Sequence, residues 1–150
     1  WDNYSNSGIY YSKGAWLFYM LADQLGKEKF TAGMRRFIKS GKQNIHTFMA
    51  EMSKAAGKDM KPFLHSWLTS KQIPGLNVQQ SAASIEFSQV GEIMNFDLEV
   101  VVKLKNGSHV SKTLHFTPRT KSLKIDAGEI ESYILDPRHK LLFQLNADPF

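Results

Sequence analysis

The chain has 150 residues, of which 42% are apolar, so it can hold one ordinary domain or two small ones with a real core. Cysteine is absent, which excludes disulfide bonds and thiolate metal ligands but leaves the cellular compartment open. The net charge of +5 is the sum of +6 in residues 1–75, with 11 Lys and Arg against 5 Asp and Glu, and −1 in residues 76–150, with 8 against 9. Because these cations are scattered, they favour a lysine-rich outer face of helices, and no nucleic-acid partner is expected.

The first residues and the longest apolar run bear on what kind of chain this is. The sequence starts without Met, and Trp1-Asp2-Asn3-Tyr4 resembles neither a signal peptide nor a transit peptide, so we expect the chain to be cut from a longer one. The longest apolar run is the eight residues from Ala15 to Ala22. About 20 such residues are needed to cross a bilayer, so no membrane span is expected.

Apolar residues recur at helical spacing up to about residue 72 and predict four helices. The first runs from about Ile9 to Leu25 and stops at Gly26, and the second runs from about Lys27 to Ser40. Asn44 and Asp59 are the expected N-terminal caps of the third and fourth helices. The later helices should bury Phe30, Met34, Phe37 and Ile38, then Phe48, Met49, Met52 and Ala56, then Phe63, Leu64, Trp67 and Leu68.

The first predicted helix has no polar stripe through its middle. A helix that is apolar all round is normally buried on all sides, but three further helices cannot wrap it completely. We therefore expect an exposed apolar patch on this helix, through which the chain can self-associate.

The sequence changes character near Ile73-Pro74-Gly75, where short alternating runs separated by turn residues begin. Seven strands are expected, and the predicted fold class is α+β, with a helical part in residues 1–72 and a small β-sandwich in residues 73–150. The strands should lie near residues 76–80, 84–90, 95–104, 108–116, 122–125, 132–135 and 141–145.

The parity of the apolar residues decides how the third and fourth strands are joined. Even positions hold two apolar sets, which are Phe96, Leu98, Val100, Val102 and Leu104 in the third strand and Val110, Leu114 and Phe116 in the fourth. A two-residue Asn106-Gly107 turn would place the two sets on opposite faces of the sheet. A three-residue loop that pairs Leu104 with Ser108, with Gly107 left-handed, places them on one face and is the expected hairpin.

The short motif Tyr11-Ser12-Lys13-Gly14 opens the apolar first helix. A tyrosine, one spacer, a lysine and a glycine at that place resemble the zinc aminopeptidases of the aminopeptidase N type, the gluzincins. The resemblance covers nearly the whole chain, and its further pieces follow in the family's order. These are Leu25-Gly26, Phe30…Gly33-Met34…Phe37, Phe48…Met52…Ala56-Gly57-Lys58-Asp59, Phe63…Trp67-Leu68, Ile73-Pro74-Gly75-Leu76 and Leu135-Asp136-Pro137…Leu141-Leu142.

The resemblance implies a C-terminal fragment of a zinc-dependent metalloaminopeptidase that removes N-terminal residues from peptides. Residues 1–72 would be the helical end of a thermolysin-like catalytic domain, and residues 73–150 a fibronectin-like sandwich. Tyr11 would be the catalytic residue whose hydroxyl stabilises the oxyanion of peptide hydrolysis. The implied partners are the peptide substrate and the missing N-terminal catalytic segment. Lys13 is expected to be structural or to pair with a carboxylate, and Asp136-Pro137 to end a strand.

The zinc site of the family cannot be placed on this sequence. The family binds zinc through His-Glu-x-x-His and a later glutamate, and no such motif occurs here. No two of the five histidines are four residues apart, and the amine-binding Gly-x-Met-x-Asn motif is missing as well. We therefore expect no metal ligand and no cofactor-binding residue in this chain, with zinc held by residues outside it. The chain alone is expected to be inactive.

Two alternatives stay open from the sequence. Tyr10 and Tyr11 are neighbours, and both could be ordinary aromatic side chains that anchor a buried helix. The whole chain could also be a non-catalytic interaction module, in which the helices and the sandwich contact a protein or a carbohydrate. Other catalytic arrangements find no support, since the chain has no Gly-x-Ser-x-Gly elbow, no cysteine nucleophile and no phosphate-binding loop.

Overall fold

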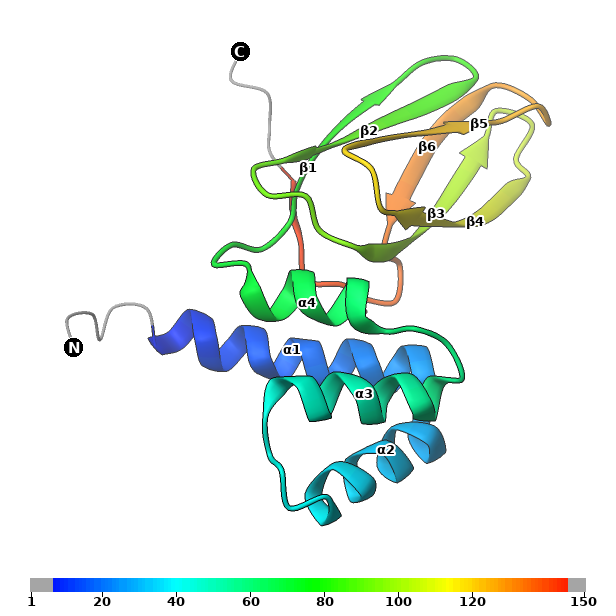
Figure 1. The fold of residues 1–150 in the computed structure, drawn as a ribbon. Coiled ribbons are helices and arrows are strands. Elements are labelled where there is room, and N and C mark those ends of the chain that lie inside the picture. The colour runs from blue at the N-terminus through cyan, green and yellow to red at the C-terminus, as the bar shows by residue number, and fades with distance from the viewer. Residues whose placement is uncertain (1–6, 146–150) are drawn as a thin grey trace. The chain divides into compact units, whose positions relative to one another are not determined.

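A computed structural model describes residues 7–145, and the side chains from Ser12 onward (Figure 1). The chain divides into two compact units, Trp1–Thr69 and Ser70–Phe150. The described part of the first unit is helical and that of the second is built of strands, so the predicted α+β class is confirmed. None of the described helices is long and apolar enough to cross a membrane.

The described part of the first unit contains four helices, and all four were predicted. Each helix end that was predicted lies within two residues of the observed end. Asn44 caps the third as expected, because its side chain accepts a hydrogen bond from the Thr47 amide at 3.0 Å. Asp59 accepts from the Lys61 amide at 3.0 Å, although Met60 lies between it and the helix. The helices are α1 (Ser7–Leu25), α2 (Lys27–Lys39), α3 (Ile45–Ala56) and α4 (Lys61–Thr69).

The helical core lies along one face of α1. The buried positions recur every three or four residues, as a helix packed on one side requires, and they are Lys13, Leu17, Met20, Leu21 and Leu25. The other face leaves Phe18 43% and Tyr19 48% exposed, which confirms the expected apolar patch.

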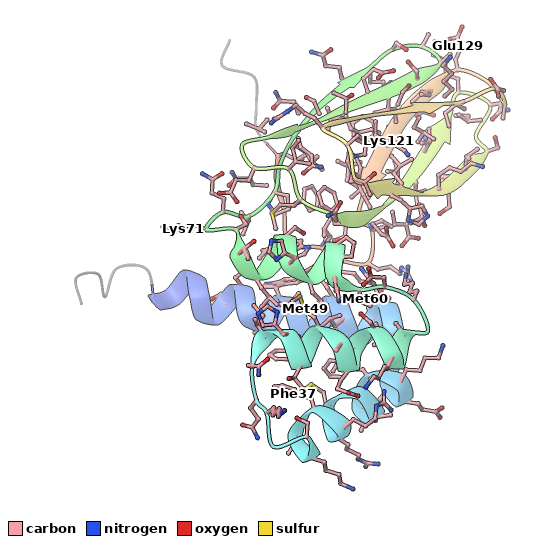
Figure 2. All side chains as sticks on the ribbon, in the orientation of Figure 1. Phe37, Met49, Met60, Lys71, Lys121 and Glu129 are labelled. Carbon is pink, nitrogen blue, oxygen red and sulfur yellow. The ribbon has the colours of Figure 1, made fainter. Side chains whose placement is uncertain are left out.

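Edge-to-face contacts between aromatic rings join α1, α2 and α3. The Phe48 ring of α3 contacts Phe18 of α1 and Phe37 of α2 with centroid distances of 5.9 and 5.4 Å, and Figure 2 shows Phe37 in the space between α2 and α3. Two predictions of buried residues are wrong, because Ile38 is 58% exposed and Leu68 is 37% exposed. Each lies at the edge of its helix's apolar stripe, next to a residue that does face the core.

The described part of the second unit contains two sheets, with strand orders β5-β2-β1-β7 and β4-β3-β6. The inner faces of the sheets meet where the Phe87 and Phe116 rings contact at 6.0 Å. All seven predicted strands are present, but the last is shortened to two residues that pair in parallel with β1. The strands are β1 (Gly75–Gln80), β2 (Ser84–Val90), β3 (Phe96–Leu104), β4 (His109–Phe116), β5 (Thr120–Lys124), β6 (Ile130–Leu135) and β7 (Gln144–Leu145).

The β3–β4 hairpin has the predicted geometry. The Leu104 amide donates to the Ser108 carbonyl at 2.9 Å, which leaves a three-residue loop, and Gly107 has φ 85°. Every second residue of β3 from Phe96 to Leu104 is buried, together with Leu114 and Phe116 of β4. The shared parity of the two strands therefore does place their apolar residues on one face.

A buried amide fastens the loop between β2 and β3. Gln89 is 2% exposed. Its Oε1 accepts from the Met94 amide at 2.8 Å, and its Nε2 donates to the Met94 and Pro118 carbonyls at 3.0 Å each. All three bonds reach backbone groups of connecting segments, so one side chain supports two loops of the sandwich.

Replacing Gln89 with leucine should lower the stability of the β unit by about 2–3 kcal/mol, because buried backbone groups at Met94 and Pro118 lose their partner. The measurement is the protection of the β3 amides against hydrogen exchange. Gln79→Leu is the control: Gln79 is exposed on β1, so its replacement should change stability by less than about 0.5 kcal/mol. If the two variants lower stability equally, the hydrogen bonds of the Gln89 side chain do not contribute the predicted stabilisation.

Candidate functional site

The predicted catalytic residue, Tyr11, belongs to α1, five residues into the helix that starts at Ser7. Its side chain lies outside the described residues, as does that of Tyr10. The choice between these two tyrosines, and the catalytic role of either, therefore stays a prediction. What the structure does describe is the part of α1 that immediately follows, from Ser12 onward.

Lys13 is the first buried side chain of α1 among those the structure describes, since Ser12 before it is exposed. It is only 7% exposed, and its Nζ lies 5.8 Å from the centre of the Trp67 ring of α4. That distance falls within the range of a cation–π interaction. The burial and this contact agree with a structural role, one of the two roles expected of Lys13, and the pairing with a carboxylate stays a prediction. Helix periodicity alone predicts that Lys13 shares a face of α1 with Leu17 and Leu21. Its contact with Trp67 depends on the packing of the helices, which the sequence pattern does not give.

Gly14 has open space beside it. A Cβ at Gly14 would meet none of the described atoms within 4 Å. Alanine is better than glycine inside a helix, so Gly14→Ala should raise the stability of α1 by about 0.5–1 kcal/mol, measured by amide exchange.

The control for this prediction is another glycine inside a helix. At Gly33 of α2 a Cβ would come within 3.0 Å of both the Ala55 Cβ and the Met52 Cε, so Gly33→Ala should be destabilising. A loss of stability in Gly14→Ala as large as that in Gly33→Ala would mean that something packs closely against Gly14.

The described residues offer no place for a metal ion. No three of their His, Asp and Glu side chains lie close enough together to hold one. All five histidines are exposed: His46, His65, His109, His115 and His139. The described residues therefore contain no group of side chains that could hold the zinc implied by the resemblance.

The ionic contacts of the described residues lie on strand and helix surfaces. His115 Nδ1 and Asp97 Oδ1 are 2.6 Å apart across the β3–β4 pair. The Glu51 carboxylate accepts hydrogen bonds from Lys54 at 2.8 Å and from Arg36 at 2.9 Å. These bonds hold the pKa of Glu51 below its usual value, and the bond from Lys54 has the larger effect. The Asp97–His115 and Arg36–Glu51 pairs join neighbouring elements, whereas Lys54 and Glu51 both belong to α3.

A shallow depression of about 160 Å³ lies on the β unit over β1, β2 and β5. Glu86 supplies its carboxylate, and that carboxylate accepts a hydrogen bond from Ser122 Oγ at 2.5 Å. None of the residues that line the depression is a histidine, so the Ser122–Glu86 pair lacks the histidine base of a Ser-His nucleophilic site. The lining residues are Asn77, Gln79, Glu86, Phe87, Ser88 and Thr120.

Asp136 follows the last residue of β6, as expected, and has a further role. It is 5% exposed, and its carboxylate accepts from the Lys140 and Leu141 amides at 2.9 and 2.8 Å. Its backbone φ is 44°, a left-handed conformation that Asp tolerates better than most residues. The resemblance had picked out Leu135-Asp136-Pro137, but nothing in those residues alone indicates that the carboxylate is buried.

Comparison with known proteins places the chain beside peptidases. No protein-family model matches it. Aminopeptidase 2, mitochondrial, of Saccharomyces cerevisiae is 24% identical over 131 residues, 79% of this chain. Leucyl aminopeptidase of Saccharolobus solfataricus is 25% identical over 142 residues, 83% of this chain. Aminopeptidase N of Lactococcus lactis is 32% identical over 87 residues, 54% of this chain.

The matched region is a small part of each relative, namely 14% of the yeast protein, 18% of the Saccharolobus protein and 10% of the Lactococcus protein. The chain therefore spans less than a fifth of these relatives. The resemblance predicted from the residues is confirmed: the chain is similar to one section of aminopeptidase N-like proteins, consistent with a fragment of such a protein.

Proposed function

We propose that this chain is a section of a zinc aminopeptidase that removes N-terminal residues from peptides. Residues 1–72 would be the helical end of a thermolysin-like catalytic domain, and residues 73–150 a fibronectin-like sandwich. The observation that carries the proposal is the similarity to three aminopeptidases from a yeast, an archaeon and a bacterium. The order of a helical unit followed by a two-sheet β unit agrees with it.

Tyr11 is the residue to which we assign a direct part in the reaction. Negative charge collects on the carbonyl oxygen of the scissile peptide bond as it is attacked. A hydroxyl already aimed at that oxygen stabilises the transition state more than the substrate, and it needs no reorganisation at the moment of reaction. A phenol suits this task because it stays protonated at neutral pH.

The zinc must come from residues outside the described ones, which have no group able to bind it. When bound elsewhere in the protein, it would supply Lewis-acid chemistry to the reaction. This chain would contribute the oxyanion donor and helices that wall the substrate cavity. In the full-length protein the exposed Phe18 and Tyr19 would be covered by the rest of the catalytic domain, whereas in the isolated chain they leave a surface for self-association.

The test compares the full-length gene product with residues 1–150 alone, both assayed on a panel of aminoacyl anilides with zinc added. The full-length protein should release the N-terminal residue and lose that activity on chelation, and residues 1–150 should give neither turnover nor tight zinc binding. Turnover by residues 1–150 alone would contradict the fragment assignment.

The competing interpretation is a non-catalytic interaction module, with the exposed face of α1 as its interface. The gene decides between them at little cost. A His-Glu-x-x-His motif encoded within roughly 60 to 80 residues upstream of Trp1 would support the enzyme, because its two histidines are zinc ligands. Its absence, together with an inactive full-length product, would favour the module.

A further inference from the structure

Lys13 is a cation in a place where burial normally selects apolar residues. It is only 7% exposed and shares the buried face of α1 with Leu17 and Leu21. A charged group costs much free energy to bury unless a partner compensates it. The face of the Trp67 ring, 5.8 Å from Nζ, provides such compensation through its negative quadrupole.

The ring that receives Lys13 is itself held in place. Trp67 is 2% exposed, and its ring packs on Phe63 of the same helix with a centroid distance of 6.1 Å. Because the ring is held in one position, an ammonium that binds to its face is also held in one position. The contact therefore links α1 to α4. The next buried side chain of α1 is Leu17, a full turn further along the helix. Lys13 is therefore the anchor nearest to the start of α1 among the described side chains.

We propose that Lys13 is a positioning residue, whose contact with Trp67 fixes the first turns of α1 and thereby the place of the Tyr11 hydroxyl. The inference rests on the proposed function of Tyr11, which precedes Lys13 by just over half a helical turn. Helix ends open more easily than helix centres unless a side chain ties them down. A donor to a developing oxyanion must be held closely, because a misplacement of about 1 Å can cost about 100-fold in rate.

The chemistry of lysine suits this role better than that of an apolar residue of similar length. A lysine can bury its methylene stem among apolar side chains while its ammonium reaches an aromatic ring. Methionine in its place would fill much of the same volume and keep the fold, but it would lose the attraction to Trp67. Arginine would keep a cation over the ring and should restore most of the effect.

The experiment uses the full-length gene product, the double variant with Lys13→Met and Trp67→Phe, and four single variants. The single variants are Lys13→Met, Lys13→Arg, Trp67→Phe and, as control, Lys29→Met on the exposed surface of α2. Lys13→Met should speed amide exchange at residues 11–15 by about 3- to 30-fold, the equivalent of one lost cation–π contact. It should also lower kcat by about 10-fold with KM little changed, as loss of alignment alone would do.

Lys13→Arg should restore most of kcat, and Lys29→Met should change neither readout. Trp67→Phe combined with Lys13→Met should cost less than the two single losses together, because Trp67→Phe weakens the same contact that Lys13→Met removes. Unchanged exchange at residues 11–15 in Lys13→Met would overturn the proposal.

Tyr11→Phe measured in the same assay separates this proposal from the proposed function. If Tyr11→Phe abolishes most of the turnover while Lys13→Met loosens the helix without lowering kcat, the positioning role is wrong and the function stands. If Tyr11→Phe has no effect on turnover, the role of Tyr11 is wrong and the positioning role falls with it.

Discussion

Replacing Tyr11 with phenylalanine in the full-length protein should lower kcat by about 100- to 1000-fold and leave KM nearly unchanged. The change removes one hydroxyl and keeps the ring, so packing around α1 should be preserved. A donor used only when the carbonyl oxygen becomes anionic contributes to the transition state and not to substrate binding. Steady-state kinetics with an aminoacyl anilide, with the zinc content of each preparation measured, give both parameters.

The control for Tyr11→Phe is the same change at the neighbouring position, Tyr10→Phe. Consecutive residues of a helix point about 100° apart, so both hydroxyls cannot occupy one place. If Tyr10→Phe causes the large loss instead, the catalytic assignment moves by one residue. If neither change affects kcat, both tyrosines are packing residues and the oxyanion donor lies elsewhere.

Periodicity was sufficient to predict the helices and strands of this chain. The four helices follow from apolar spacing and from caps such as Asn44, and the β3–β4 hairpin follows from parity alone. Periodicity fails at the margins of an apolar stripe. Ile38 and Leu68 are each next to a residue that faces the core, Phe37 and Trp67, and a sequence does not tell how wide the covered stripe is.

The candidate site could be predicted only in part. Tyr11 came from the resemblance to aminopeptidases, and no spacing argument singles it out from Tyr10. The contact between Lys13 and Trp67 joins helices that are far apart in the sequence, so it needs the packing of α1 against α4. The burial of Asp136 in the β unit also could not be predicted from the sequence. Its carboxylate is covered by the turn that follows it, and no pattern in the preceding residues indicates this turn.

The turn after β6 depends on this carboxylate, and Asp136→Ala should lower the stability of the β unit by about 3 kcal/mol. The two carboxylate oxygens accept hydrogen bonds from the Lys140 and Leu141 amides at 2.9 and 2.8 Å, and alanine would remove both acceptors. Leu141 is itself buried. Alanine would also be strained at the φ of 44° that the turn requires. The turn leads the chain from β6 toward β7, so loosening it should weaken both sheets.

Hydrogen exchange of the β3 and β6 amides measures this loss peptide by peptide. Tryptophan fluorescence reports separately on the helical unit, since Trp1, Trp16 and Trp67 all belong to it. Asp136→Asn should cost about half as much as Asp136→Ala, because one acceptor oxygen remains and asparagine tolerates the left-handed backbone. Asp126→Ala, at an exposed position, is the control and should change stability by less than about 0.5 kcal/mol. If Asp136→Ala behaves like Asp126→Ala, the turn is held by its apolar contacts at Leu141, and the two carboxylate bonds contribute little.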